Sequence, residues 1–230
     1  MLISNELKES INAALLASDA ILKIYNQSNF KVFIKEDNSP LTIADKISNS
    51  IITQNLKIFG YPILSEEGVD IDYETRKKWK KYWCIDPIDG TKEFINRNGE
   101  FTINISLIVE NKPSLGVVYS PVSKDLYFAQ IGIGSFMIKD FKDLECINKN
   151  NITNLSNLKL PDTFTVVVSR SHINSETELF LKALEKKNDK LNIISKGSSL
   201  KICLVAERIA HCYPRLGPTM EWDTAAAHAV

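Results

Sequence analysis

The chain has 230 residues, 44% of them hydrophobic, and its 28 Lys and Arg residues balance its 28 Asp and Glu residues. This length and composition allow a buried core, either in one domain or in two small ones that share a cleft. A net charge of zero excludes binding to nucleic acid or anionic lipid through a bulk excess of positive charge, although it permits a local charged site.

The cysteines and the N-terminus indicate the compartment. Cys84, Cys146, Cys203 and Cys212 form no CxxC pair, so we expect reduced, mostly buried thiols. The N-terminal sequence lacks the basic and apolar regions of a signal peptide. No apolar run reaches the roughly 18 residues that span a bilayer. We therefore expect a cytoplasmic protein with no integral membrane segment and no nucleic-acid partner, with peripheral contact at the inner membrane face left open.

The first part of the chain predicts two helices with a short strand between them. Apolar residues spaced by three, four and seven over residues 5–27 indicate an amphipathic helix, and residues 30–35 predict a strand. Thr42 can cap a second helix together with Asp45 three residues later, a variant of the capping box. Gly60 suits the C-terminal end of that helix.

The middle of the chain predicts an antiparallel meander of strands. The apolar runs are short, turn residues separate them, and the first two end at clusters of acids. A polar, Asn-rich segment follows at residues 142–160, and we place a subdomain boundary there. The predicted strands lie at residues 62–64, 82–85, 101–107, 115–119 and 126–131.

Strands alternate with helices in the last part of the chain, which is typical of a smaller α/β unit. We therefore expect an α+β part at residues 1–150 and an α/β part at residues 151–230. The predicted strands of the second part are 165–168, 191–195 and 212–215, and its predicted helices are 175–187, 198–211 and 221 onward.

The most informative stretch is Asp86-Pro-Ile-Asp89-Gly90, which follows a buried strand. Proline and glycine restrain a turn that carries two carboxylates, and such a pair can converge on Mg²⁺. The N–H groups of Gly90, Thr91 and Lys92 would open a helix, and a helix N-terminus attracts phosphate. Taken alone, the same residues also fit an ordinary solvated turn.

Acids at the ends of other apolar elements favour the metal site over the solvated turn. Glu66 and Glu67 end one such run, Asp223 begins a late helix and Asp45 begins an early one. Carboxylates gathered in this way are costly unless a cation collects them. Haloacid-dehalogenase-type phosphatases offer another interpretation, but their Asp-x-Asp-Gly-Thr motif spaces its acids by two residues rather than three.

Three motifs together resemble a known family. Asp86-Pro-Ile-Asp-Gly-Thr91, preceded by Leu64-Ser-Glu-Glu67 and followed by Trp222-Asp-Thr-Ala-Ala226, resembles the inositol monophosphatase superfamily of Mg²⁺-dependent, lithium-sensitive phosphatases. Lys92-Glu-Phe94 favours its CysQ-type branch, which hydrolyses 3′(2′),5′-bisphosphate nucleotides, since inositol phosphatases tend to have Thr-Asn-Phe there. The resemblance extends over nearly the whole chain and implies a layered α/β fold, a sugar-phosphatase-like αβαβα sandwich.

The resemblance implies two or three Mg²⁺ ions and a ligand set. Glu66, Asp86 and the carbonyl of Ile88 would hold a first ion, and Asp86, Asp89 and Asp223 a second. Glu67 is the alternative to Glu66, which we prefer because the family's ligand is usually the first acid of the pair.

The resemblance also implies catalytic roles without a covalent intermediate. Asp45 would help to position a third ion or its water, and Thr91 would orient the nucleophilic water. Glu66 or Asp45, together with Thr91, would take the proton of that water. The ions and the amides at Gly90 and Thr91 would stabilise charge on the phosphoryl group and on the leaving oxygen.

Two later segments resemble the nucleotide-binding segments of the family: Ser169-Arg-Ser-His172 and Gly197-Ser-Ser-Leu-Lys201. Lys201 suits the phosphate that does not react, His172 the base, and Arg215 the edge of the pocket. A surface histidine and a plain N-cap remain alternative interpretations of His172 and Ser198. The expected substrate-binding residues are Gly90, Thr91, Lys92, Arg170, His172, Ser198, Ser199, Lys201 and Arg215.

The expected reaction is Mg²⁺-dependent removal of the 3′-phosphate from adenosine 3′,5′-bisphosphate, which gives AMP and phosphate, in the context of sulfur assimilation. The related 5′-phosphosulfate is a second expected substrate. An inositol- or sugar-phosphate phosphatase is one alternative, and a metal-dependent nucleotide-binding protein without turnover is another. Family members continue beyond the helix that begins near Trp222, so we also expect that these residues do not form a complete domain of this kind.

Overall fold

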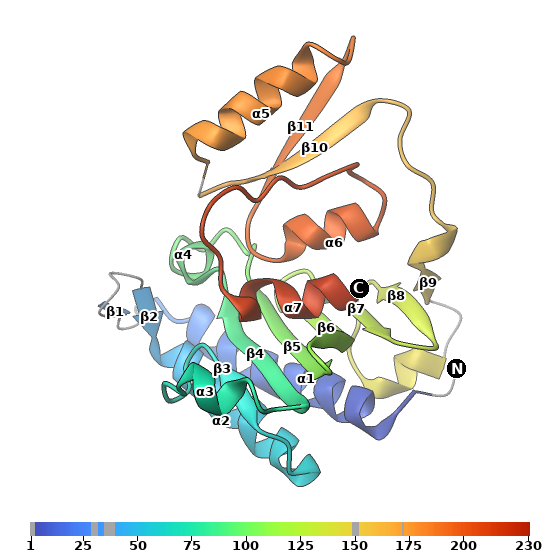
Figure 1. Cartoon of the computed structure of the whole chain (residues 1–230). Coiled ribbons are helices and arrows are strands. Elements are labelled where there is room, and N and C mark those ends of the chain that lie inside the picture. The colour runs from blue at the N-terminus through green and yellow to red at the C-terminus, as the bar shows by residue number, and fades with distance from the viewer. Residues whose placement is uncertain (1–2, 29–31, 35–39, 149–151, 172) are drawn as a thin grey trace.

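The computed structural model describes residues 3–28, 32–34, 40–148, 152–171 and 173–230. Five layers follow one another in Figure 1: two helices, a large sheet, two more helices, a small sheet and a single outer helix. This arrangement confirms the expected α/β fold with αβαβα layers.

Helices α1 (Asn5–Tyr25) and α2 (Ile43–Leu56) form the first layer. The buried residues of α1 recur at the spacings that predicted the helix. The capping box of Thr42 and Asp45 begins α2 as expected, but Gly60 ends a further short turn, η1 (Lys57–Phe59), rather than α2 itself. Gly60 has a φ of 67°, which glycine adopts without strain. Before α2, β1 (Val32–Ile34) pairs antiparallel with β2 (Pro40–Thr42).

The large sheet has seven strands in the order β3 to β9. β3 and β4 are parallel, and all later pairs are antiparallel. The meander is therefore confirmed from β4 to β7, whereas β3, which was predicted within it, pairs parallel with β4. β8 and β9 extend the meander beyond the prediction. The strands are β3 (Ile63–Ser65), β4 (Lys81–Asp89), β5 (Thr102–Val109), β6 (Lys112–Ser120), β7 (Asp125–Gln130), β8 (Gly134–Ile138) and β9 (Thr153–Asn154). The short helices α3 (Tyr73–Arg76) and α4 (Thr91–Ile95) precede and follow β4.

Side chains along β5 alternate between the two faces of the large sheet. Ile103, Ile105 and Leu107 belong to the cluster that packs under α1 and α2. Thr102, Asn104 and Ser106 point to the opposite face and are also buried. This face carries hydrogen bonds to α7 and to the residues before α6, so the sheet has a buried polar stripe beneath the third layer.

Helices α6 (Leu200–Ala206) and α7 (Glu221–Ala229) form that third layer. Helix α7 crosses β6 at Gly116, where a Cβ atom would lie only 2.1 Å from the carbonyl oxygen of Ala226. Glycine is therefore required for α7 to lie this close to the sheet. The close approach fixes the height of Asp223 above the strands.

The small sheet contains β10 (Phe164–Ser169) and β11 (Leu191–Lys196), which are parallel and connected through α5 (Ser175–Glu185). The strand predicted at residues 212–215 is wrong, because Cys212 forms only an isolated bridge to Val166. The helix predicted at 198–211 is also too long. Ser198 and Arg208 have φ values of 45° and 56°, and such left-handed residues cannot continue an α-helix.

The polar segment at residues 142–160 holds two short turns, η2 (Leu144–Asn148) and η3 (Leu155–Asn157), and strand β9. β9 still pairs with β8, and α7, later in the chain, contacts four strands of the large sheet. The division into residues 1–150 and 151–230 stays a prediction.

The four cysteines are free thiols, as expected. Among the described residues, no helix combines the length and apolarity that a membrane crossing needs.

Candidate active site

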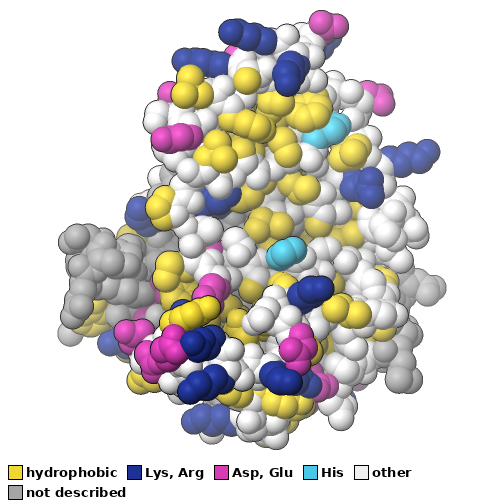
Figure 2. All heavy atoms as spheres, in the orientation of Figure 1, with side chains coloured by type: hydrophobic (Ala, Val, Ile, Leu, Met, Phe, Trp, Pro, Cys, Tyr) yellow, Lys and Arg dark blue, Asp and Glu magenta, His cyan; other side chains and the backbone are white. Residues whose placement is uncertain are grey.

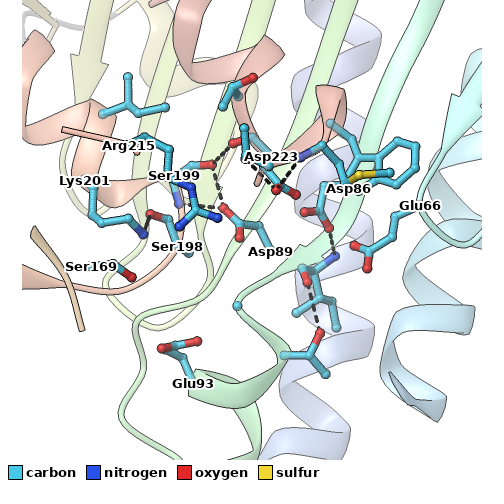
Figure 3. A pocket seen from close by; sticks show the side chains of 18 of the residues that line it. Glu66, Asp86, Asp89, Glu93, Ser169, Ser198, Ser199, Lys201, Arg215 and Asp223 are labelled. Atoms are coloured by element: carbon cyan, nitrogen blue, oxygen red, sulfur yellow. Dashed lines mark hydrogen bonds between the residues drawn. The ribbon is translucent and has the colours of Figure 1, made fainter. Parts of the chain in front are cut away.

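A cavity of about 500 Å³ lies between the large sheet and the small sheet. Acidic residues from the first part of the chain and hydroxyl and basic residues from the second part line it together (Figure 3). Acidic and basic side chains are interspersed over the face shown in Figure 2, which fits the zero net charge. The predicted residues that line the cavity are Glu66, Asp86, Ile88, Asp89, Gly90, Thr91, Lys92, Ser198, Ser199, Lys201, Arg215 and Asp223.

Asp86 and Asp89 both lie in β4 rather than in a turn beyond it. Residues three apart in a regular strand point to opposite faces of the sheet. Here the pairing register with β5 shifts between Asp86 and Asp89, and such a bulge reorients the chain locally. Both carboxylates therefore line the same cavity. Gly90 follows with a φ of 92°, which allows the abrupt change from strand to α4.

Asp86 is 1% exposed and accepts a hydrogen bond of 3.1 Å from the backbone amide of Ile88. Glu66 follows β3, which is parallel to β4. The side chains of Glu66 and Asp86 are in hydrogen-bond contact. Burial raises the pKa of Asp86 well above its ordinary value, and the negative charges of Glu66, Asp89 and Asp223 raise it further. A cation at this point would relieve both effects.

Asp89 receives its contacts from the other side of the cavity. Its Oδ2 accepts hydrogen bonds of 2.6 Å from the amide of Ser199 and 2.6 Å from its hydroxyl, and one of 3.3 Å from Asn104 Nδ2. Burial raises the pKa of Asp89, although the charge of Lys201 and the hydrogen bonds from Ser199 oppose the rise.

Asp223 lies in the first turn of α7 and completes the group of acids. Its Oδ2 accepts hydrogen bonds from Thr219 Oγ1 at 2.9 Å and from the amide of Met220 at 3.0 Å. The Ser199 hydroxyl also lies 2.9 Å from the Asp223 carbonyl oxygen. A single serine therefore joins Asp89 to the start of α7.

The donor set fits a hard divalent cation, because the cavity offers carboxylates and the carbonyl of Ile88. Asp89 and Asp223 each direct one oxygen to protein donors (Figure 3). As they stand, no three His, Cys, Asp or Glu side chains of the described ranges form a group arranged to hold an ion. Glu66 lines the cavity and Glu67 does not, which supports the preference for Glu66.

Asp45 and Thr91 come together although 46 residues separate them. Thr91 Oγ1 lies 3.1 Å from Asp45 Oδ1 and can donate to it. The other oxygen of Asp45 accepts hydrogen bonds of 2.7 Å and 2.6 Å from the amide and hydroxyl of Thr42. Burial raises the pKa of Asp45, against the opposing effect of these bonds. The acid of the capping box, Asp45, is thus also a buried carboxylate beside Thr91.

Lys201 is the buried cation of the site, with 7% of its surface exposed. Its ammonium donates to the carbonyl of Ser198 and lies 5.4 Å from the centre of the Tyr213 ring. Burial lowers the pKa of Lys201, while the charges of Asp89 and Glu93 oppose the change. Arg215 donates to the carbonyl of Pro218 at 2.8 Å and lines the same side of the cavity (Figure 3).

One expected binding residue is not brought into the cavity, and a second is not described by the structure. Arg170 is absent from its lining, and its guanidinium forms two hydrogen bonds of 2.9 Å with Glu100. His172 lies outside the described residues. Glu93 lines the cavity and Asn104 donates to Asp89, although neither was predicted as a site residue. Asn104 had a signal, because Thr102, Asn104 and Ser106 alternate with apolar residues and so mark a polar face of β5.

Known proteins resemble this chain over nearly its whole length. The family model described as "Inositol monophosphatase family" matches residues 4–230. The chain is 43% identical over 227 residues to the 3′(2′),5′-bisphosphate nucleotidase CysQ of Salmonella typhimurium, across 97% of this chain and 86% of that protein. It is 45% identical over 217 residues to CysQ of Escherichia coli K12, across 93% and 82% of the two chains.

A solved structure gives the same result. The crystal structure of CysQ from Bacteroides thetaiotaomicron, described as a bacterial member of the inositol monophosphatase family, superposes with a TM-score of 0.87 at 46% identity. The match covers 96% of this chain and 83% of that one. With the family model and the relatives in agreement over nearly its whole length, this chain belongs to the inositol monophosphatase family.

Proposed function

We propose that this chain is a 3′(2′),5′-bisphosphate nucleotidase that removes the 3′-phosphate of adenosine 3′,5′-bisphosphate and gives AMP and phosphate. The observation that carries the proposal is the polarity of one cavity. Glu66 and Asp86 lie on one side, Lys201 and Arg215 on the other, and Asp89 between them (Figure 3). One side suits a metal-dependent reaction at one phosphate and the other suits a second phosphate. The CysQ nucleotidases are the relatives of 43% to 46% identity.

Members of this family depend on Mg²⁺, and the residues that would hold it here are Glu66, Asp86, Asp89, Asp223 and the carbonyl of Ile88. When bound, Mg²⁺ supplies Lewis-acid stabilisation of phosphoryl charge and makes a water in the site more acidic. The proposed number of ions is two or three. Burial raises the pKa of Asp86 because it disfavours the ionised carboxylate. A bound cation would stabilise that ionised form.

The chain's own residues can position and deprotonate the attacking water. Thr91 Oγ1 donates to Asp45 Oδ1, so its lone pairs are left to accept from a water in the cavity. As the oxygen of the water bonds to phosphorus, its proton passes to Thr91 Oγ1 and the Thr91 proton passes to Asp45. The bond from phosphorus to the ribose oxygen breaks, and solvent protonates the leaving oxygen. The bonds from Thr42 keep Asp45 in place for this transfer.

A protein with no net charge can accept this anionic substrate when cationic side chains line its site. Lys92, Lys201 and Arg215 line the cavity, and bound metal would add further positive charge. Ser198 and Ser199 offer hydroxyls beside Lys201. A free nucleotide in the cytoplasm is the substrate that we propose, and the 5′-phosphosulfate analogue is the second.

The proposal is tested with purified protein in Mg²⁺. Phosphate release is measured from adenosine 3′,5′-bisphosphate, its 5′-phosphosulfate analogue, inositol 1-phosphate and a sugar bisphosphate, with and without Li⁺. We expect the bisphosphate nucleotide to be preferred, Li⁺ to inhibit, and Asp89→Asn to lose turnover. Preference for inositol 1-phosphate would contradict the substrate assignment, and full turnover by Asp89→Asn would contradict its role as a ligand. Binding of AMP without release from any substrate would identify a protein that binds nucleotides without turnover.

A further inference from the structure

One carboxylate outside the proposed catalytic machinery contacts three residues on two separate segments. Glu100 lies between α4 and β5, and its side chain is 14% exposed. It accepts two hydrogen bonds of 2.9 Å from Arg170, forms an ion pair of 3.2 Å with Lys196, and accepts a bond of 2.8 Å from the amide of Gly197. Arg170 follows β10 and Lys196 ends β11. Glu100 therefore ties the ends of both strands of the small sheet to the large one.

The contact with Gly197 reaches the backbone of a segment that lines the cavity. A Cβ atom at Gly197 would lie 2.7 Å from Glu93 Cγ and 2.9 Å from the carbonyl oxygen of Glu100. Only glycine allows the chain to lie this close, which brings its amide within reach of the carboxylate. We term residues 197–201 the 197–201 loop. Its first residue, Gly197, is held in place by the Glu100 carboxylate.

The same loop is held a second time two residues later. The amide of Ser199 donates to Asp89 Oδ2 at 2.6 Å. Ser198, between the two amides, has a φ of 45°, a left-handed conformation that is strained in a residue other than glycine. Such a conformation persists only where its surroundings enforce it. Glu100 and Asp89 together provide that restraint, and it places Ser198 in the lining of the cavity.

The positive charge of Arg170 is paired with the Glu100 carboxylate. Its two bonds to Glu100 form a bidentate pair, which has the preferred geometry for arginine and carboxylate. The pair lies beside the cavity rather than in its lining. Arg170 thus contacts the partner that fixes the 197–201 loop, and not the space that a phosphate would occupy.

We propose that Glu100 is a positioning residue for substrate binding, and that Arg170 acts through it by holding the Glu100 carboxylate under the amide of Gly197. This inference rests on the proposed function, because it assigns the 197–201 loop to the bisphosphate nucleotide. Loss of the restraint lets the loop relax and weakens binding equally in the ground state and the transition state. The KM rises while kcat is kept.

The experiment is a double-mutant cycle with Glu100→Gln, Arg170→Ala and the double variant in the full-length chain. KM and kcat are measured with adenosine 3′,5′-bisphosphate, affinity for AMP by calorimetry, and thermal unfolding as the check on folding. Glu110→Gln is the matched control, because Glu110 is an exposed acid paired only loosely, at 3.9 Å, with Lys80 at the far end of β5. We expect each single variant to raise KM by about tenfold, and the double variant to match Glu100→Gln, as coupled residues do.

Three results would overturn the inference. Glu100→Gln with the KM of wild type would show that the restraint does not matter. Additive effects in the cycle would give Arg170 a substrate contact of its own. A fall in kcat at unchanged KM would place the effect on Asp89 rather than on binding. If wild type released no phosphate from the nucleotide, the proposed function would fail by itself, and the AMP affinities of the variants would still decide the role of Glu100.

Discussion

Asp89 and Ser199 lie 110 residues apart in the sequence, yet Asp89 Oδ2 accepts hydrogen bonds of 2.6 Å from both the amide and the hydroxyl of Ser199. The same hydroxyl accepts a bond of 2.8 Å from Asn104 and lies beside the carbonyl of Asp223. The Ser199 hydroxyl therefore connects β4, β5 and the starts of α6 and α7 at the acidic side of the cavity.

Ser199→Ala should reduce both activity and stability. The amide bond to Asp89 remains, but the Asp89 carboxylate loses one donor and Asn104 loses an acceptor. We expect the free energy of unfolding to fall by about 1–3 kcal/mol, the usual cost of a buried polar group left unpaired, and kcat/KM to fall by at least tenfold. Ser156→Ala is the control, because Ser156 is exposed and its hydroxyl donates to Asn154, its one side-chain partner among the residues that the structure describes. Equal kcat/KM in both variants would contradict the role of Ser199.

Asp86→Asn should separate stability from activity. The amide oxygen of Asn can still accept from Ile88, while the buried negative charge and its repulsion by Glu66, Asp89 and Asp223 are removed. We expect the metal-free variant to unfold at a higher temperature than wild type, by the equivalent of about 1 kcal/mol, and to be inactive. A lower unfolding temperature without metal would show that the Asp86 charge is already compensated in the apoprotein.

Mg²⁺ should stabilise wild type and should do so through the acidic residues. A ligand that binds only the folded state stabilises it by about 2.7 kcal/mol at 100 times its dissociation constant. We expect Mg²⁺ to raise the unfolding temperature of wild type, a chelator to reverse the shift and abolish turnover, and Asp86→Asn to respond much less. KCl at matched ionic strength controls for screening. The same shift in wild type and Asp86→Asn would place the ion elsewhere.

Gly116→Ala should disturb the site from a distance. The added methyl group would meet the carbonyl oxygen of Ala226 at 2.1 Å and the Cβ of Ala229 at 2.7 Å, so α7 must move away from β6. We expect a loss of about 1–3 kcal/mol in unfolding free energy from overpacking and a loss of activity as Asp223 is displaced. Gly132→Ala meets nothing within 4 Å and has a φ of 90°, so it measures backbone strain alone. Comparable loss of activity in the two would argue against displacement of α7.

The contribution of Glu100 to stability should vanish in acid. Burial would raise the pKa of Glu100, but hydrogen bonds from Arg170 and the amide of Gly197, together with Lys196, outweigh burial and lower it. A lowered pKa in the folded state means that ionised Glu100 stabilises the fold above its ordinary pKa of 4.5 and that this stabilisation is lost as pH falls through the folded-state value. Denaturant unfolding of wild type and Glu100→Gln should therefore differ at pH 7 and converge below pH 4.5. A difference that persists in acid would exclude the charge as its cause.

Much of the site was predictable because its signals are local. The acids of Asp86-Pro-Ile-Asp89, the capping box of Thr42 and Asp45, and the start of α7 all depend on neighbours within a few residues, and the structure keeps each of them. The prediction of a turn at Asp86 was wrong, since β4 runs on to Asp89 and its pairing with β5 decides where the strand ends. The motif around Arg170 predicts a substrate-binding residue, whereas Arg170 pairs with Glu100, which lies 70 residues earlier.

The sequence by itself determined the chemistry of this protein: the types and spacing of its acids, hydroxyls and cations, and the elements that carry them. Tertiary structure decided which of them meet. The bulge that brings Asp86 and Asp89 to one cavity, the contact of Asp89 with Ser199 and the approach of α7 over Gly116 arise from pairing and packing between distant segments. Local propensity carries no information about such contacts, because their energy exists only once the sheet and the helices are assembled.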